Sequence, residues 1–92
     1  DANDLIYQVA ASRNYDPSPK LETITAPVLW INSADDFINP PELVIAEVQA
    51  KRLKQGTFVL LPASEKTRGH GSHTWAVLWK DRLAAFLKAT EK

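Results

Sequence analysis

The chain contains no cysteine and no methionine, and it has only three glycines. Without cysteine, disulfides, thiolate metal sites and cysteine nucleophiles are excluded, and the absence is compatible with a reducing cytoplasm. The sequence begins at Asp1 with neither an initiator methionine nor a signal-peptide pattern. We therefore expect these 92 residues to be a piece of a longer, cytoplasmic protein.

Net charge and long apolar runs are also lacking. Lys+Arg and Asp+Glu number 11 each, so the formal net charge is zero. A neutral chain has no basic footprint for nucleic acid or for an anionic membrane surface. The longest apolar runs, residues 26–31 and 58–62, are far too short to span a bilayer. We expect neither a nucleic-acid partner nor a membrane partner.

What is present is a regular alternation of apolar patterns. These patterns predict helices over residues 1–13, 40–54 and 73–90, and strands over residues 28–32 and 57–61. Pro17 and Pro19 make the stretch after the first helix a linker. Strands that alternate with helices imply an α/β fold with a parallel sheet. Two parallel strands are too few for a stable sheet, so we expect the remaining strands to come from a parent protein or another chain.

The two later helices have their own signals. Asn39 is suited to cap the middle helix, with Pro40 as its first residue and Glu42 in its first turn. The apolar residues expected to face inward from this helix are Val44, Ile45, Val48 and Leu53. The apolar face of the last helix is wider and is expected to comprise Trp75, Leu78, Trp79, Leu83, Phe86 and Leu87.

Groups suited to acid–base chemistry follow both predicted strands. Asp35 and Asp36 come directly after the first strand, and His70 lies eight residues beyond Pro62, where the second strand stops. In an open parallel sheet, functional groups collect in the loops beyond the carboxyl ends of the strands. If the strands are adjacent, an aspartate from the first loop can accept the N–H of the histidine. Such a contact sets the tautomer and stabilises the imidazolium.

Other interpretations of the same residues stay open. His70 and His73 with Asp35 or Asp36 could bind a metal, although an H-x-x-H spacing is weak support. His73 fits better as the first turn of the closing helix. Asp35 is expected to be a solvated or loop-bracing neighbour. Arg68 is either a solvated loop residue or a contact for an anionic group.

The motifs YDPSP, INSADD, NPPE, PASE and TRGHG occur in this order along the chain. Together they resemble the C-terminal end of an α/β-hydrolase fold, and most of all homoserine O-acetyltransferase-like proteins, a group of acyltransferases and ester hydrolases. The resemblance covers essentially the whole chain. It implies that residues 1–19 are the end of a cap region and a linker, and that residues 20–92 are the last two strands and helices of a single domain.

The resemblance also implies roles for two residues. The triad acid in such enzymes follows a small residue by three positions and precedes a proline by four, which fits Ser33, Asp36 and Pro40. The triad histidine follows glycine in the last loop, which fits His70. The triad order of this fold is Ser, then Asp, then His. Asp36 and His70 are therefore the expected catalytic pair of a serine-dependent ester hydrolase or O-acyltransferase.

The nucleophile itself is absent, because the chain has no G-x-S-x-G elbow. We expect the chain to be inactive alone and to need an upstream segment or companion chain that carries the serine. The implied ligand is a small ester or acyl donor, with acyl-CoA as co-substrate in a transferase and with no metal or bound cofactor. The alternative is a non-catalytic binding or assembly module whose exposed sheet edge pairs with a partner chain or a second copy.

Overall fold

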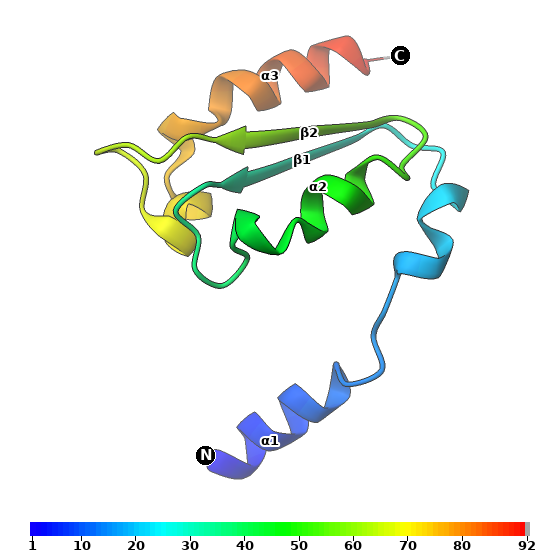
Figure 1. Ribbon diagram of the computed structural model, residues 1–92, viewed down its shortest axis with the longest axis vertical. Helices are drawn as coiled ribbons and strands as arrows, with labels where there is room; N and C mark the ends of the chain where they lie inside the picture. Colours follow the sequence, from blue (N-terminus) through cyan, green and yellow to red (C-terminus); the bar gives the residue numbers. More distant parts are fainter. Residues whose placement is uncertain (92) are drawn as a thin grey trace.

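Helices and strands alternate along the chain, as predicted for an α/β fold. The structure is a computed structural model that describes residues 1–91 (Figure 1). Its elements are α1 (Ala2–Ala11), β1 (Val28–Ser33), α2 (Ile45–Ala50), β2 (Gly56–Leu61) and α3 (Lys80–Ala89). Short 3-10 turns cover Ser18–Thr23, Pro41–Leu43, Gly69–Thr74 and Ala76–Leu78. None of the helices within residues 1–91 has the length and apolar character needed to cross a membrane.

The two strands pair in parallel, which confirms the predicted orientation and shows that the strands are adjacent. Their register runs from Val28 opposite Gly56 to Ser33 opposite Leu61. Beyond the last pair, the Ala34 N–H donates to the Leu61 carbonyl at 2.9 Å. Because both strands end at the same level, the loops that follow them start side by side at the carboxyl edge of the sheet.

Helices α2 and α3 lie on opposite sides of this sheet (Figure 1). Successive strand residues point to opposite faces, so each face has its own set of side chains. Leu29, Ile31 and Leu61 share a hollow with Leu83 and Phe86 of α3. On the other face, Trp30 and Phe58 meet edge to face at 6.2 Å between ring centroids. The strand pair therefore has α2 on one face and α3 on the other.

The core is shallow. The buried apolar side chains within residues 1–91 are those of Leu21, Ala50, Leu53 and Leu61. Most of β1 and the middle of β2 are only half-buried, so the sheet is incompletely covered within residues 1–91. Both strands are edge strands, and each leaves one row of backbone groups unpaired with another strand.

Helix α1 is close to its predicted bounds, and Asp1 caps it by accepting the Asp4 N–H at 3.0 Å. The helix lies apart from the sheet, at the end of an extended linker (Figure 1). Its apolar residues Leu5, Ile6 and Val9 are 61–63% exposed. The predicted amphipathic pattern is therefore present, but nothing within residues 1–91 covers its apolar face.

The middle helix is shorter than predicted and starts later. Pro40 is extended, with ψ at 140°, and the 3-10 turn that follows ends at Val44 in the left-handed region, with φ at 59°. Asn39 does not cap a helix: Pro40 precedes the 3-10 turn without a side-chain capping hydrogen bond, and Val44 precedes α2. The prediction that the middle helix is continuous from residue 40 was wrong.

The same break changes which side chains of this segment are buried. Val44, Ile45 and Val48 are 45–60% exposed rather than facing inward, whereas Leu53 is buried as predicted. A β-branched residue in the left-handed region is a strained backbone position. It separates the 3-10 turn from α2, so the apolar spacing no longer lies on one helical face.

The last helix also begins later than predicted, at Lys80 rather than His73. The backbone at Trp75, with φ at −112° and ψ at 81°, separates two 3-10 turns and interrupts any longer helix. Trp75 is 43% exposed instead of belonging to the core, and the Arg68 guanidinium lies 4.3 Å from its ring centroid. The Trp79 indole N–H donates to the Ser72 carbonyl at 3.3 Å, which ties the start of α3 to the loop.

Candidate functional site

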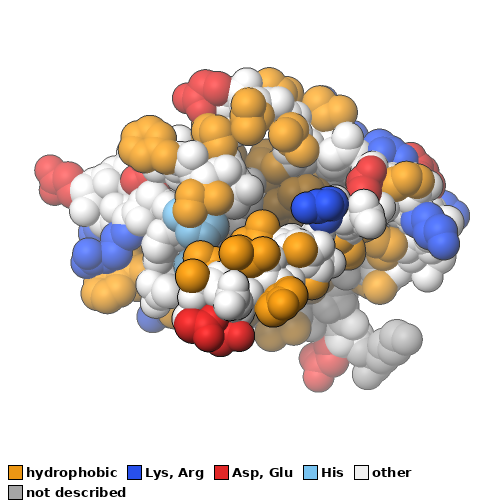
Figure 2. Space-filling model, turned by 90° about the horizontal axis from the view of Figure 1, so that it is seen from below, with side chains coloured by type: hydrophobic (Ala, Val, Ile, Leu, Met, Phe, Trp, Pro, Cys, Tyr) orange, Lys and Arg blue, Asp and Glu red, His pale blue; other side chains and the backbone are white. Residues whose placement is uncertain are grey.

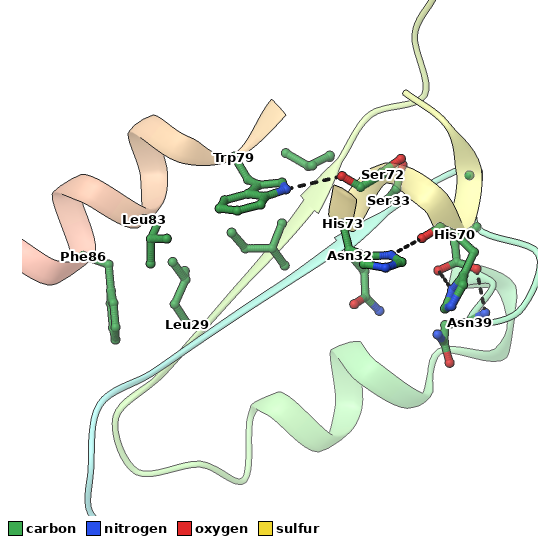
Figure 3. A pocket seen from close by; sticks show the side chains of 14 residues that line it. Leu29, Asn32, Ser33, Asn39, His70, Ser72, His73, Trp79, Leu83 and Phe86 are labelled. Carbon is green, nitrogen blue, oxygen red and sulfur yellow. Dashed lines mark hydrogen bonds and ion pairs between the residues drawn. The ribbon is translucent and has the colours of Figure 1, made fainter. Parts of the chain in front are cut away.

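Asp36 and His70 meet at the carboxyl edge of the sheet. Asp36 comes three residues after the end of β1, and His70 belongs to the 3-10 turn Gly69–Thr74 in the loop after β2. His70 Nδ1 lies 3.1 Å from Asp36 Oδ2 (Figure 3). Two residues that are 34 positions apart in sequence are thus brought into hydrogen-bond contact, as the position of the loops predicted.

The Asp36 carboxylate is held by the backbone of its own loop. Its Oδ1 accepts the N–H of Ile38 at 2.8 Å and that of Asn39 at 3.0 Å. The residue is only 7% exposed, so few water molecules compete for these contacts. With Oδ1 occupied, Oδ2 is the oxygen that faces His70. The carboxylate therefore has a set orientation before it meets the imidazole.

These contacts keep Asp36 ionised. The Asn39 N–H has the largest effect, followed by the hydrogen bond with His70 and the Ile38 N–H, and together they lower the pKa of Asp36 from 3.8 to about 2. Hydrogen bonds to a carboxylate stabilise its charged form. At neutral pH Asp36 is therefore an anion that accepts a proton donor from His70.

The low pKa of Asp36 has a measurable consequence for stability. Because the folded pKa is about 2 and the ordinary value is 3.8, the contribution is complete above about pH 4 and is lost as the pH falls toward 2. We expect the urea midpoint of the wild-type chain to fall more steeply between pH 4 and pH 2 than that of Asp36→Asn. Unfolding followed by tryptophan fluorescence measures both midpoints. If the urea midpoints of both proteins changed equally with pH, the low pKa of Asp36 would make no contribution to stability.

The contact with Asp36 determines where His70 carries its proton. A carboxylate oxygen only accepts, so the donor must be Nδ1–H, and the neutral imidazole then has an unprotonated Nε2. The His70 side chain is 47% exposed. None of the hydrogen bonds within residues 1–91 involves its Nε2. This nitrogen is consequently in the right state to accept a proton from a substrate or nucleophile.

Asp35 has a different set of partners from Asp36. Its carboxylate accepts the Ser33 hydroxyl at 2.5 Å and the Thr67 hydroxyl at 2.8 Å. The Ser33 hydrogen bond, and then that of Thr67, lower the pKa of Asp35 below its ordinary value. Of the two adjacent carboxylates, Asp36 is therefore the one that contacts His70, and Asp35 joins the two loops.

His73 belongs to the same 3-10 turn as His70 instead of to the closing helix. Its Nδ1 lies 2.7 Å from the His70 carbonyl oxygen, and the two rings are 5.5 Å apart between centroids. A carbonyl oxygen only accepts, so His73 Nδ1 donates. The sequence reasoning missed this contact, although the i, i+3 spacing of the two histidines matches a 3-10 turn.

The metal alternative finds little support in this arrangement. The carboxylates of Asp35 and Asp36 each bind hydrogen-bond donors of their own loops. Across residues 1–91, no group of three or more His, Cys, Asp and Glu side chains is placed to hold a metal ion. His70 and His73 thus lack a third protein ligand in the described part of the chain.

One of the two glycines that flank His70, Gly69, has a backbone conformation that favours glycine. Its φ is +57°, in the left-handed region that glycine adopts without strain. A Cβ at this position would lie 3.2 Å from the Asp35 carbonyl oxygen. Gly69 therefore lets the His70 loop turn close to the Asp35–Asp36 loop. Gly71 has no comparable constraint, because a Cβ there would lie 3.9 Å from its nearest neighbour.

His70 lies at one end of a hollow between α3 and the sheet. The hollow has a volume of about 590 Å³, with His70, His73 and Asn39 at its polar end and Leu29, Leu83 and Phe86 at its apolar end (Figure 3). Figure 2 shows hydrophobic side chains gathered on the face of the molecule seen there, with histidine exposed among them. The hollow therefore joins the Asp–His pair to an uncovered apolar surface.

The serines of the chain do not complete a triad. Ser33 and Ser72 are 5% and 4% exposed, and their hydroxyls are engaged with Asp35 and with the Arg68 N–H. No hydrogen bond within residues 1–91 joins a serine hydroxyl to His70. The site thus has an acid and a base but no hydroxyl next to the base.

Comparisons of the chain with protein-family models, curated proteins and solved structures found no match. The chemistry of the site therefore follows from the geometry of its own residues. That geometry places Asp36 and His70 together. It leaves Arg68 stacked on Trp75, and it keeps Asp35 apart from the imidazole.

Proposed function

We propose that the chain is the C-terminal portion of a serine-dependent ester hydrolase or O-acyltransferase with an α/β-hydrolase fold. In this proposal it resembles homoserine O-acetyltransferase-like proteins. It supplies Asp36 and His70 of a Ser–Asp–His triad, and the serine lies in an upstream segment or a companion chain. The observation that supports this most is the 3.1 Å contact between Asp36 and His70 at the carboxyl edge of a parallel sheet.

The proposed reaction uses the tautomer that Asp36 selects. His70 Nε2 accepts the proton of the serine hydroxyl while the serine oxygen forms a bond to the acyl carbon. His70 then gives that proton to the departing alkoxide or thiolate, which leaves an acyl-serine. In the second half, water or an acceptor hydroxyl gives a proton to His70 and attacks the acyl carbon. The serine recovers its proton, and an acid or a new ester is released.

The open surfaces of the chain fit the same proposal. A serine nucleophile and its oxyanion-hole donors need a supporting structure next to His70. The free edge of β1, the half-buried strands and the apolar hollow beside α3 offer a place for further strands and helices. The partner of this surface would thus carry the catalytic groups that residues 1–91 lack.

A second candidate function is favoured by those same open surfaces. An assembly module would use the free strand edges to pair with a partner chain or a second copy, with no chemistry at His70. Such a module needs no set tautomer and no ionised Asp36 beside an exposed imidazole. The two candidates therefore differ in whether a reactive serine is present next to this segment.

A fluorophosphonate probe separates the two candidates. The probe forms a covalent bond to a serine only where a nearby base activates the hydroxyl. We expect the protein that contains this segment together with its upstream or companion part to be labelled on one serine outside residues 1–92. The isolated 92-residue chain serves as the control and should not react. A complete protein without labelled serine would favour the assembly module. Intact mass and peptide mapping locate the label.

A further inference from the structure

The two loops of the site are joined by a second set of hydrogen bonds that does not include His70. The Thr67 hydroxyl lies 2.8 Å from Asp35 Oδ2, across 32 positions of sequence, and 2.9 Å from the Ser64 carbonyl oxygen, so its one proton is shared between these two acceptors. The other oxygen, Oδ1, accepts the hydroxyl of Ser33, the last residue of β1. The Asp35 carboxylate therefore lies between the end of β1 and the loop that carries His70.

The Thr67 end of this connection is itself anchored. The Thr67 hydroxyl oxygen accepts the Ser64 N–H at 2.9 Å, and the Thr67 N–H donates to the Ser64 carbonyl at 3.2 Å. Residues 64–67 thus form a closed turn. Thr67 stands three positions before His70, and Gly69 between them passes close to the Asp35 carbonyl oxygen. A fixed Thr67 therefore limits where the His70 backbone can lie.

We propose that Asp35 and Thr67 are positioning residues that hold the His70 loop at the distance required for the Asp36–His70 contact. The proposal rests on the proposed function for its catalytic consequence, but the geometry of the contact can be tested without any activity. Neither side chain touches the imidazole, so both act through the loop. We call this Ser33–Asp35–Thr67 connection the loop clamp.

The exposure of the catalytic pair explains why a clamp is needed. Asp36 is 7% exposed and fixed by two backbone N–H groups, whereas the His70 side chain is 47% exposed and has one hydrogen bond to Asp36. A single hydrogen bond at a solvent-exposed site contributes a free energy little larger than the entropic cost of ordering the loop that carries it. The hydrogen bonds to the Asp35 carboxylate are charge-assisted, like the one to Asp36, and they order the loop independently of His70.

Substitution of Thr67 in the protein that carries both this segment and the nucleophile tests the clamp. Thr67→Val keeps the shape of the side chain and the charge of Asp35, but it removes the hydroxyl. We expect kcat for a p-nitrophenyl ester to fall by about 10- to 100-fold with KM within about 2-fold, because a small misplacement of a catalytic group lowers the chemical step. Thr67→Ser restores the hydroxyl and should stay within about 3-fold of wild type.

A spectroscopic measurement reports the contact directly. The His70 Nδ1–H that is hydrogen-bonded to Asp36 should give a low-field proton resonance, assigned by its loss in Asp36→Asn. We expect Thr67→Val to weaken or broaden this resonance and Thr67→Ser to retain it. Thr25→Val is the matched control, because Thr25 lies at the opposite end of the strands and should change neither kcat nor the resonance.

Asp35→Asn covers the case in which Thr67→Val fails to fold, as judged by circular dichroism. Asp35→Asn keeps the size of the side chain and removes the charge, and it should lower kcat in the same direction. Where both variants fold, Asp35→Asn combined with Thr67→Val should lose little more than Thr67→Val alone, because the two residues share one interaction. Full additivity, or wild-type kcat in every clamp variant, would overturn the proposal.

The outcome also separates the clamp from the proposed function. If His70→Ala abolishes turnover while Thr67→Val and Asp35→Asn leave kcat and the resonance unchanged, the clamp is wrong and the proposed function stands. If His70→Ala keeps full turnover, the proposed function is wrong. The low-field resonance then still decides whether the clamp holds His70 against Asp36.

Discussion

Replacing His70 by alanine is expected to lower kcat by at least about 10⁴-fold in the protein that combines this segment with the nucleophilic serine. The reason lies in the state of the imidazole. Asp36 holds the proton at Nδ1, so Nε2 is the base, and no other histidine contacts a carboxylate within residues 1–91. Without His70 the serine hydroxyl keeps its proton, and the acyl-transfer step has no base or acid.

The measurement is steady-state turnover of a series of short p-nitrophenyl esters, with the fluorophosphonate probe as a second readout. His73→Ala is the matched histidine control. Because the His73 side chain contacts the His70 carbonyl and lies beside the His70 ring, but contacts no carboxylate, we expect its effect to stay within about 10-fold. Retention of wild-type turnover by His70→Ala would show that this histidine is not the base.

Added imidazole gives a further test of the same role. The His70 side chain is 47% exposed, so its removal leaves a space that opens to solvent. A soluble imidazole can enter such a space and accept the serine proton. Partial recovery of turnover by imidazole in His70→Ala, but not in a variant of the serine itself, would assign the lost activity to a missing base instead of to a damaged fold.

The sequence was sufficient to predict the parts of the fold that depend on local patterns. The apolar runs at residues 28–32 and 57–61 fall in the two parallel strands, and the first helix lies close to its predicted bounds. A contact between an aspartate of the first loop and His70 was also predictable, because it follows from two loops at the same edge of adjacent parallel strands, whereas the choice of Asp36 over Asp35 came from the resemblance. These features need only periodicity and topology.

The helix boundaries were not predictable, because tertiary contacts decide them. The signal at Asn39, Pro40 and Glu42 is a good helix start, but the Asn39 N–H is used by Asp36 and the helix begins at Ile45. The stretch from His73 has helical apolar spacing, yet buried Ser72 and the backbone at Trp75 keep it in 3-10 turns. In both places a backbone break, at Val44 and at Trp75, interrupts the helical spacing.

The loop clamp shows what was missing from the sequence reasoning about the site. Asp35 could be described only as a solvated or loop-bracing residue, because nothing in its own surroundings points to Thr67. The pairing depends on a turn at residues 64–67 and on a left-handed Gly69, neither of which apolar periodicity reports. Which hydroxyl and carboxylate side chains of the two loops form hydrogen bonds can therefore be identified only from the three-dimensional structure.

Asp36→Asn is expected to lower kcat by about 10³- to 10⁴-fold, although the side chain keeps its size and shape. The backbone explains the size of this effect. The N–H groups of Ile38 and Asn39 both point at Oδ1 and need an acceptor there. An asparagine satisfies them by placing its amide oxygen at that position, so its NH₂ group faces His70. An NH₂ group donates, which forces Nδ1 to accept and moves the imidazole proton to Nε2.

The expected loss thus comes from the wrong tautomer rather than from a displaced loop, and the two causes can be distinguished. Asp35→Asn is the matched control, because it is the same substitution one residue earlier on a carboxylate that contacts hydroxyl groups instead of His70. It should lower kcat by no more than about 100-fold, through the clamp alone. Nitrogen-15 spectra of the imidazole identify the protonated nitrogen in each variant. Equal losses in the two variants, with the proton still at Nδ1 in Asp36→Asn, would mean that Asp36 acts only as a structural support for its loop.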